Sequence, residues 1–223
     1  LFYTPLLPFL EVILHKTFSI PLWETYRMLT GIAYILAPIS VFLLARQLSK
    51  NFVSGFIAGV LYSVGPTIFY FLVPEVAMDR FSFEFWDPRR FTILVRWGEG
   101  PHTFSLIFVH LVGVFFARYL EKYKLIDLVI AAIFLGAAAL SNSLGLFAAI
   151  LLVFSMTFAA ASIHPKTSKK TIFSFLLLGA LCLGLISFWY NLSFIFNFFG
   201  EGEGSLKLYL SLFPWGWLAA LFL

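Results

Sequence analysis

The residues best suited to chemistry lie in the stretch WGEGPH, residues 97–102. Two glycines flank Glu99, so a tight backbone can present its carboxylate, and the proline that follows is tolerated in the first turn of a helix. Glu99 and His102 together could carry out general acid–base catalysis or share a metal ion. A second interpretation is equally compatible: a helix-entry turn in which Glu99 favours the positive end of the helix dipole.

The segment before this motif, residues 74–100, is the most highly charged part of the chain. Its mixture of acids and arginines cannot enter hydrocarbon, so we expect it in water or in a polar cavity. Arginine binds phosphate through a planar, bidentate fork, and tryptophan can stack on a sugar face. The predicted phosphate ligands are Arg89, Arg90 and Arg96, with Trp97 beside them, and Asp79 joins Glu99 as a candidate acid, base or metal ligand. The alternative is a solvated loop whose arginines touch lipid headgroups.

Composition indicates what surrounds these residues. Hydrophobic residues make up 61% of the 223 and charged residues 12%, compared with about 25% charged in a soluble domain. The mean hydropathy of +0.95 places the chain in a membrane. Cys182 is the single cysteine, which excludes an internal disulfide. Because the chain begins and ends within apolar sequence, we expect it to be a fragment of a longer protein.

About seven apolar runs are suited to crossing a bilayer, where backbone groups must be satisfied within a helix. We predict an all-α, polytopic helical bundle. The runs are Met28–Ala45, Phe52–Val73, Thr103–Ala117, Leu125–Leu140, Leu144–Ile163, Ile172–Tyr190 and a truncated Leu208–Leu223.

The loops between the runs alternate in charge. Three short loops, around residues 46–50, 118–124 and 166–170, contain eight Lys and Arg residues, and the positive-inside rule places them in the cytoplasm. A net charge of +4 distributed in this way indicates membrane lipids as partners and gives no support to nucleic acid. The segments between these loops, including residues 74–100, then face outwards.

We expect one transmembrane domain in four parts. These are an outer juxtamembrane helix and loop (1–27), a helix pair (28–73), the outer polar loop (74–100) and further spans (101–223). Two prolines and three ionisable residues interrupt the first helix, which favours an interfacial position over a short kinked span. Gly55 and Gly59 predict close helix packing. His110 falls within a span, where a neutral histidine bonded to a neighbouring helix is the more common case and a functional group the alternative.

The order of these pieces resembles a known superfamily. The run from YTPLLPFLEVILHKTF through TIFY, residues 3–70, resembles the region of GT-C glycosyltransferases in which a proline-bearing juxtamembrane helix leads through an arginine into a span. The run from WGEGPH through LSNSLG to LLVF looks like the middle of the same fold in bacterial and archaeal membrane proteins labelled 6-pyruvoyl-tetrahydropterin synthase-related, a label that implies no pterin chemistry.

The resemblance implies transfer of a sugar from a polyprenyl-phosphate donor at the outer face of a bacterial or archaeal plasma membrane. It carries over Tyr3 and Arg27 as juxtamembrane elements, and His102 and Asn142 as parts of the cavity wall. The acidic pair that usually acts as the base in this superfamily lies in a first outer loop, which would precede Leu1. Relatives often read LSHPLG where this chain has LSNSLG.

The function expected from these observations is a membrane glycosyltransferase, with Mg²⁺ or Mn²⁺ as candidate ions for the departing phosphate. Two alternatives come from other classes. A transporter or flippase of a lipid-linked or anionic solute would need broken helices and polar groups near the bilayer midplane. A non-catalytic assembly subunit would use the same spans and the same glycine packing without a working site.

Overall fold

The computed structural model describes residues 4–64, 90, 94–95, 98–194 and 196. The chain divides into two compact units: Thr4–Leu185, here called the helical unit, and Leu1–Tyr3 with Ile186–Leu223. Every element of regular structure in the described residues is helical, as predicted. The elements are α1 (Leu6–Phe18), α2 (Leu22–Ser49), α3 (Phe52–Val64), α7 (Gly100–Lys122), α8 (Leu125–Ser141), α9 (Ser143–Ile163), a 3-10 turn (Pro165–Thr167) and α10 (Ser168–Ile186).

Four described segments are long and apolar enough to cross a membrane: α2, α7, α9, and α10 with the 3-10 turn that precedes it. Two further apolar helices are shorter, since α3 has 13 residues and α8 has 17. At about 1.5 Å per residue, α8 covers roughly 26 Å, slightly less than a typical hydrocarbon core of about 30 Å. The chain therefore has the character of a membrane protein, with four helices of membrane-spanning length at the positions of predicted runs. One of them, α10, ends at Ile186, four residues before the predicted end of its run. Residues 65–73 of the second predicted run and all of the last run lie outside the described residues.

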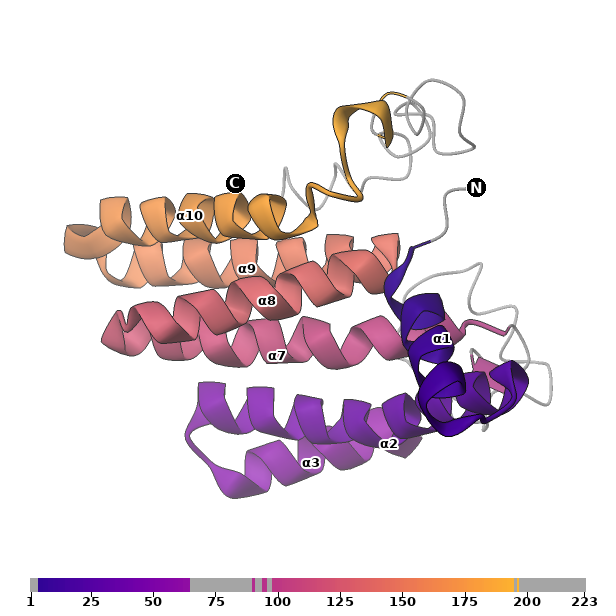
Figure 1. Cartoon of the computed structure of the whole chain (residues 1–223). Coiled ribbons are helices and arrows are strands. Elements are labelled where there is room, and N and C mark those ends of the chain that lie inside the picture. The colour runs from indigo at the N-terminus through magenta and orange to yellow at the C-terminus, as the bar shows by residue number, and fades with distance from the viewer. Residues whose placement is uncertain (1–3, 65–89, 91–93, 96–97, 195, 197–223) are drawn as a thin grey trace, which may run out of the picture. The chain divides into compact units, whose positions relative to one another are not determined.

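Helices α2 and α7 run parallel along the helical unit (Figure 1). Gly100 contacts Tyr26 near the starts of the two helices, and Lys50 contacts Glu121 near their ends. Fully buried small residues, among them Ala33 and Ala37, line the middle of α2. Small side chains allow membrane helices to approach closely, which is the packing that bilayers favour.

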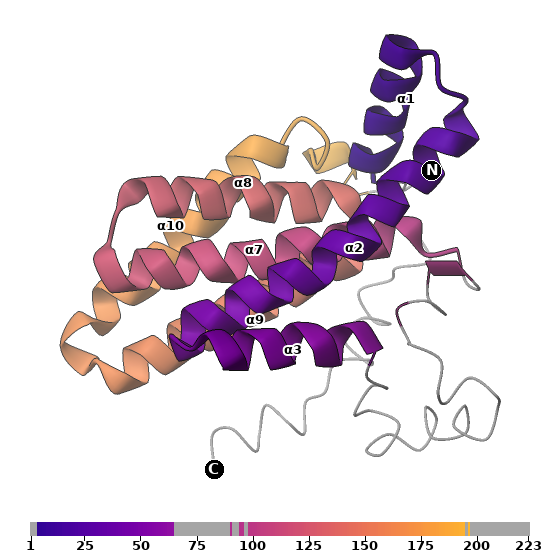
Figure 2. The same cartoon turned by 90° about the horizontal axis from the view of Figure 1, so that it is seen from below.

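Helix α3 folds back against α2 (Figure 2). A β-carbon placed on Gly55 would lie 2.9 Å from the Phe42 carbonyl oxygen, and one on Gly59 would lie 3.1 Å from the Pro38 carbonyl oxygen. A β-carbon on Gly55 would force a neighbour to shift and one on Gly59 would crowd the contact, so the predicted packing role of this pair is confirmed. The pair is used within the chain, between neighbouring helices.

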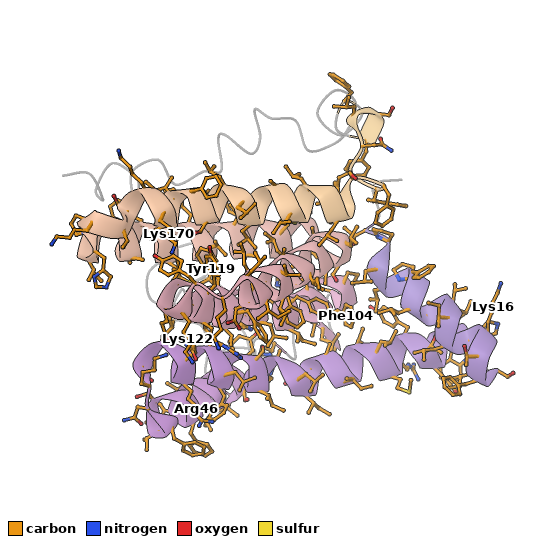
Figure 3. The ribbon with its side chains drawn as sticks, turned by 60° about the vertical axis from the view of Figure 1, so that its left-hand side comes forward. Lys16, Arg46, Phe104, Tyr119, Lys122 and Lys170 are labelled. Carbon is orange, nitrogen blue, oxygen red and sulfur yellow. The ribbon has the colours of Figure 1, made fainter. Side chains whose placement is uncertain are left out.

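The helices that follow α7 alternate in direction. Helix α8 returns antiparallel to α7, and Asn142 separates it from α9. Contacts then bring two sets of helix termini together. The ends of α2 and α7 and the starts of α8 and α10 form one set, here called the basic end, where Arg46, Lys122 and Lys170 are labelled in Figure 3. The starts of α2, α7 and α9 and the end of α8 form the other, here called the Gly100 end.

The three basic loops of the sequence thus come together, as their charge pattern predicts. Lys50 forms an ion pair with Glu121, linking α2 to α7. Lys170, near the start of α10, lies 3.6 Å from the ring centroid of Tyr123. The end of α7 is therefore fastened to both a preceding and a following helix.

Candidate functional site

The loop that enters α7 owes its conformation to two glycines. Gly98 has a φ of +69°, in the left-handed region that favours glycine. The N–H of Gly100 donates back to the Gly98 carbonyl at 2.8 Å, and the Tyr26 hydroxyl donates to the same oxygen at 3.2 Å. A β-carbon on Gly100 would collide with the Tyr26 hydroxyl. The tight backbone predicted around Glu99 is confirmed, and Tyr26 of α2 holds it in place.

Glu99 occupies the N-cap position of α7, and its carbonyl accepts from the backbone N–H of Thr103 at 3.0 Å. Its side chain is exposed, and its negative charge lies at the positive end of the helix dipole. The imidazole of His102 interacts with the Glu99 carboxylate and with the Asn142 side chain. Glu99 and His102 are close in sequence, whereas Asn142 comes from the turn between α8 and α9, so the fold brings the three predicted site residues together at the Gly100 end.

His102 is partly buried, and its Nδ1 atom is buried with no hydrogen-bond partner in the described part of the chain. A buried polar atom without a partner is uncommon in folded proteins and calls for an explanation. A ligand that donates to Nδ1, or accepts from it, would supply one.

The turn between α8 and α9 forms the wall next to His102. The Asn142 Oδ1 atom accepts from the backbone N–H groups of Leu144 at 2.8 Å and Gly145 at 3.2 Å, which caps α9. Gly145 packs directly against the Ser105 side chain of α7, where a β-carbon would collide. Thr4 donates from its hydroxyl to the Ser141 carbonyl at 2.6 Å. The helix hairpin predicted at residues 141–143 is confirmed and is locked against α7.

The other predicted site residues divide into two groups. Arg27 is exposed, and its guanidinium lies 5.0 Å from the ring of Trp23, one turn earlier in α2. Arg90 lies away from this region, against α2 and α3. The remaining predictions lie outside the described residues: Tyr3, Asp79, Arg89, Arg96 and Trp97.

Arg90 contacts α2 at a point where the helix lacks one of its own hydrogen bonds. Pro38 lies inside α2 and has no N–H, so the Tyr34 carbonyl, four residues earlier, receives no intrahelical bond at that position. Nη2 of Arg90 donates to this oxygen at 2.5 Å. In a membrane a freed carbonyl is normally satisfied by a neighbouring polar group, and here the guanidinium does so.

His110 is bonded to a neighbouring helix, which confirms the more common of its two interpretations. Its Nδ1 atom lies 3.0 Å from the Ser40 hydroxyl oxygen in α2. That hydroxyl donates its one proton to the Ala37 carbonyl at 2.6 Å. It therefore accepts from Nδ1–H, which leaves Nε2 of the neutral ring as an acceptor.

Sequence reasoning missed three residues that shape these regions: Tyr26, Pro38 and Tyr62. The one signal available was Pro38, because a proline within an apolar run indicates a carbonyl in need of a partner. Neither Tyr26 nor Tyr62 belongs to a motif, and their roles depend on which helices are neighbours.

Among the described residues, no group of three His, Cys, Asp or Glu side chains is arranged to hold a metal ion. No protein-family model, curated protein or solved structure matches this chain. The contacts at the Gly100 end and around Arg90 are thus the basis for any functional conclusion.

Proposed function

We propose that the chain belongs to a membrane glycosyltransferase with a GT-C-like helical domain, transferring a sugar from a polyprenyl-phosphate donor at the face of the membrane opposite the basic loops. The observation that carries the proposal is the meeting of Glu99, His102 and Asn142 at the Gly100 end. A carboxylate, an imidazole and an amide are suited to holding and deprotonating a sugar hydroxyl. Their place at the end of a span is where the head of a lipid-linked donor lies.

In the proposed reaction the acceptor hydroxyl oxygen attacks the anomeric carbon of the donor sugar. The bond from that carbon to the phosphate oxygen breaks, and the phosphate departs on its lipid. Glu99 takes the hydroxyl proton, since its exposed carboxylate is within reach of an incoming acceptor. His102 and Asn142 orient that acceptor. Predicted ligands for the departing phosphate are Arg89 and Arg96.

Sugar transfer measured in membranes carrying the protein tests the proposal, with radiolabelled polyprenyl-phosphate sugars as donors. We expect Glu99→Gln to lower the transfer rate by about a hundredfold or more, the usual contribution of a general base. Glu24→Gln is the matched control, because Glu24 is also exposed and lies in the first turn of α2. Equal rates in wild type and Glu99→Gln would remove Glu99 from the mechanism and with it the main support for the proposal.

A second candidate function, transport of an anionic solute, is supported by the pairing of Arg90 with the carbonyl freed by Pro38. Transporters place charged groups inside the bundle, as Arg90 is placed here, and many also break their helices, whereas α2 is continuous through Pro38. Flux of an anion into proteoliposomes, lost in Arg90→Met and retained in Glu99→Gln, would favour this function over sugar transfer.

A further inference from the structure

The guanidinium of Arg90 is held between two aromatic rings on different helices. Its central carbon lies 4.3 Å from the ring centroid of Tyr34 in α2 and 4.6 Å from that of Tyr62 in α3. Both contacts are within the range of cation–π attraction. With Nη2 bonded to the Tyr34 carbonyl, the position and the plane of the guanidinium are fixed by its neighbours.

Two polar groups in this cluster have no well-aligned hydrogen bond. Nε of Arg90 and the hydroxyl of Tyr62 are both buried, and neither makes a well-aligned bond in the described part of the chain, although the two side chains are close enough to interact with each other. Nε carries a proton that it can only donate, and the phenol can donate as well. Two buried donors therefore lie in one place, which is the arrangement that accommodates an acceptor atom.

A third group lies beside them. The rings of Tyr62 and His110 meet edge to face, with centroids 5.4 Å apart. Because Nδ1 of His110 donates to Ser40, Nε2 is an acceptor, so the ring borders the cluster without itself bonding a negatively charged oxygen. No carboxylate among the described residues is paired with Arg90. The cluster thus offers a fixed positive charge and two donors to a negatively charged oxygen.

The depth of the cluster constrains what can reach it. Tyr34 follows the exposed Arg27 by seven residues of α2, or about 10 Å at about 1.5 Å per residue. A charged group that reaches this depth through hydrocarbon needs an apolar tail, because free ions partition poorly into hydrocarbon.

We propose that Arg90 and Tyr62, with His110 beside them, form a binding site inside the bundle for the oxyanion of an amphiphile, a phosphate or carboxylate group attached to an alkyl chain. The oxyanion accepts from Nε of Arg90 and from the Tyr62 hydroxyl, and charge-assisted bonds of this kind are the stronger class of hydrogen bond. The site does not depend on sugar transfer, and its test is independent of that reaction.

The test uses the protein in nanodiscs of phosphatidylcholine, with decyl phosphate and decanoate as probes. NMR of the arginine Nε–H resonances reports on Arg90 directly, and Arg90→Met assigns its signal. We expect both amphiphiles to shift this resonance. Tyr62→Phe should weaken binding about tenfold, the effect of one hydrogen bond to a charged group. Tyr34→Phe is the matched control, since it keeps its ring on Arg90 and its hydroxyl is not one of the unpartnered groups, so we expect affinity within about twofold of wild type.

A parallel titration with inorganic phosphate distinguishes an oxyanion attached to an alkyl chain from a free oxyanion. Binding of decyl phosphate that excess inorganic phosphate fails to displace supports an amphiphile. Displacement at equal concentrations overturns the requirement for a tail. Absence of any shift at Arg90, or equal affinities of wild type and Tyr62→Phe, overturns the site. Because Tyr62→Phe keeps the ring contact, it decides the matter even if Arg90→Met fails to fold.

Discussion

The two ends of the helical unit hold their ionisable groups in opposite ways. At the basic end each of two acids is matched to a cation: Glu121 to Lys50, and Asp127 to Arg118. At the Gly100 end Glu99 is exposed, and His102 beside it keeps a buried nitrogen without a partner in the described residues. Charges at the basic end therefore fasten helices to one another, whereas the Gly100 end keeps polar groups available to a ligand.

Asp127 is a buried acid at the basic end and is paired with one cation. Its side chain is 2% exposed, and its Oδ1 atom lies 3.1 Å from Nε of Arg118, whose side chain is 45% exposed. Both carboxylate oxygens lack a well-aligned hydrogen bond in the described residues, so the contact is an ion pair by distance only. The carboxylate depends on this one cation and on its place in the first turn of α8.

The largest predicted effect follows from removing that cation. Arg118→Met should lower the free energy of unfolding by about 3 kcal/mol or more, because it leaves a buried carboxylate without a partner. Asp127→Asn should lower it by only about 1 kcal/mol, since the remaining guanidinium is half exposed and can reach headgroups or water. Equilibrium unfolding in mixed micelles titrated with dodecyl sulfate measures both.

Lys50→Met is the control for this pair of variants. Its ion pair with Glu121 is exposed on both sides, at 57% and 40%, and exposed pairs contribute about 0–1 kcal/mol. If Arg118→Met and Asp127→Asn destabilise the protein equally, the difference in burial between the Asp127 and Arg118 side chains has no energetic consequence. The comparison of the two ends of the helical unit would then lose its physical basis.

The next effect concerns the Gly100 end. Gly100→Ala should lower the free energy of unfolding by about 1–3 kcal/mol, because the added methyl group would collide with Tyr26 and lie 2.8 Å from the Thr30 side chain. Gly31→Ala is the matched control: Gly31 is helical and nothing lies within 4 Å of its added β-carbon. There we expect up to about 1 kcal/mol of stabilisation from helix propensity. Effects of the same sign in the two variants would contradict the close approach of α7 to Tyr26.

Much of the fold was predictable from sequence because hydrocarbon imposes a simple rule. A long apolar run must be a helix there, and basic residues between runs indicate which loops share a side. The residues 141–143 could be identified as a turn because an Asn between two serines is a strong helix N-cap signal. The bounds of α8 were predictable as well, since the run predicted at Leu125–Leu140 is the helix Leu125–Ser141.

The site was predictable only where its residues were close in sequence. Glu99 and His102 could be paired because they are three positions apart at the start of one helix, and the glycines of WGEGPH indicated their tight turn. Placing Arg90 required knowing which helices meet. Its charge suggested an exposed loop, whereas the structure places it between the rings of Tyr34 and Tyr62. Contacts across the bundle leave no local pattern in a single sequence.

The smallest predicted effect tests how Arg90 is held. Pro38→Ala restores an N–H to α2 and gives the Tyr34 carbonyl its own helical partner. Arg90→Met should then destabilise the protein less in the Pro38→Ala background than in wild type, by about 1 kcal/mol, because the carbonyl no longer needs the guanidinium. In a control double-mutant cycle of Pro38→Ala with Arg27→Met, the two changes in unfolding free energy should add, since Arg27 is exposed and contacts Trp23 instead of the Tyr34 carbonyl. If the effects of Pro38→Ala and Arg90→Met on the unfolding free energy also add, the guanidinium is held by the two aromatic rings alone. The Tyr34 carbonyl freed by Pro38 then plays no part in placing it.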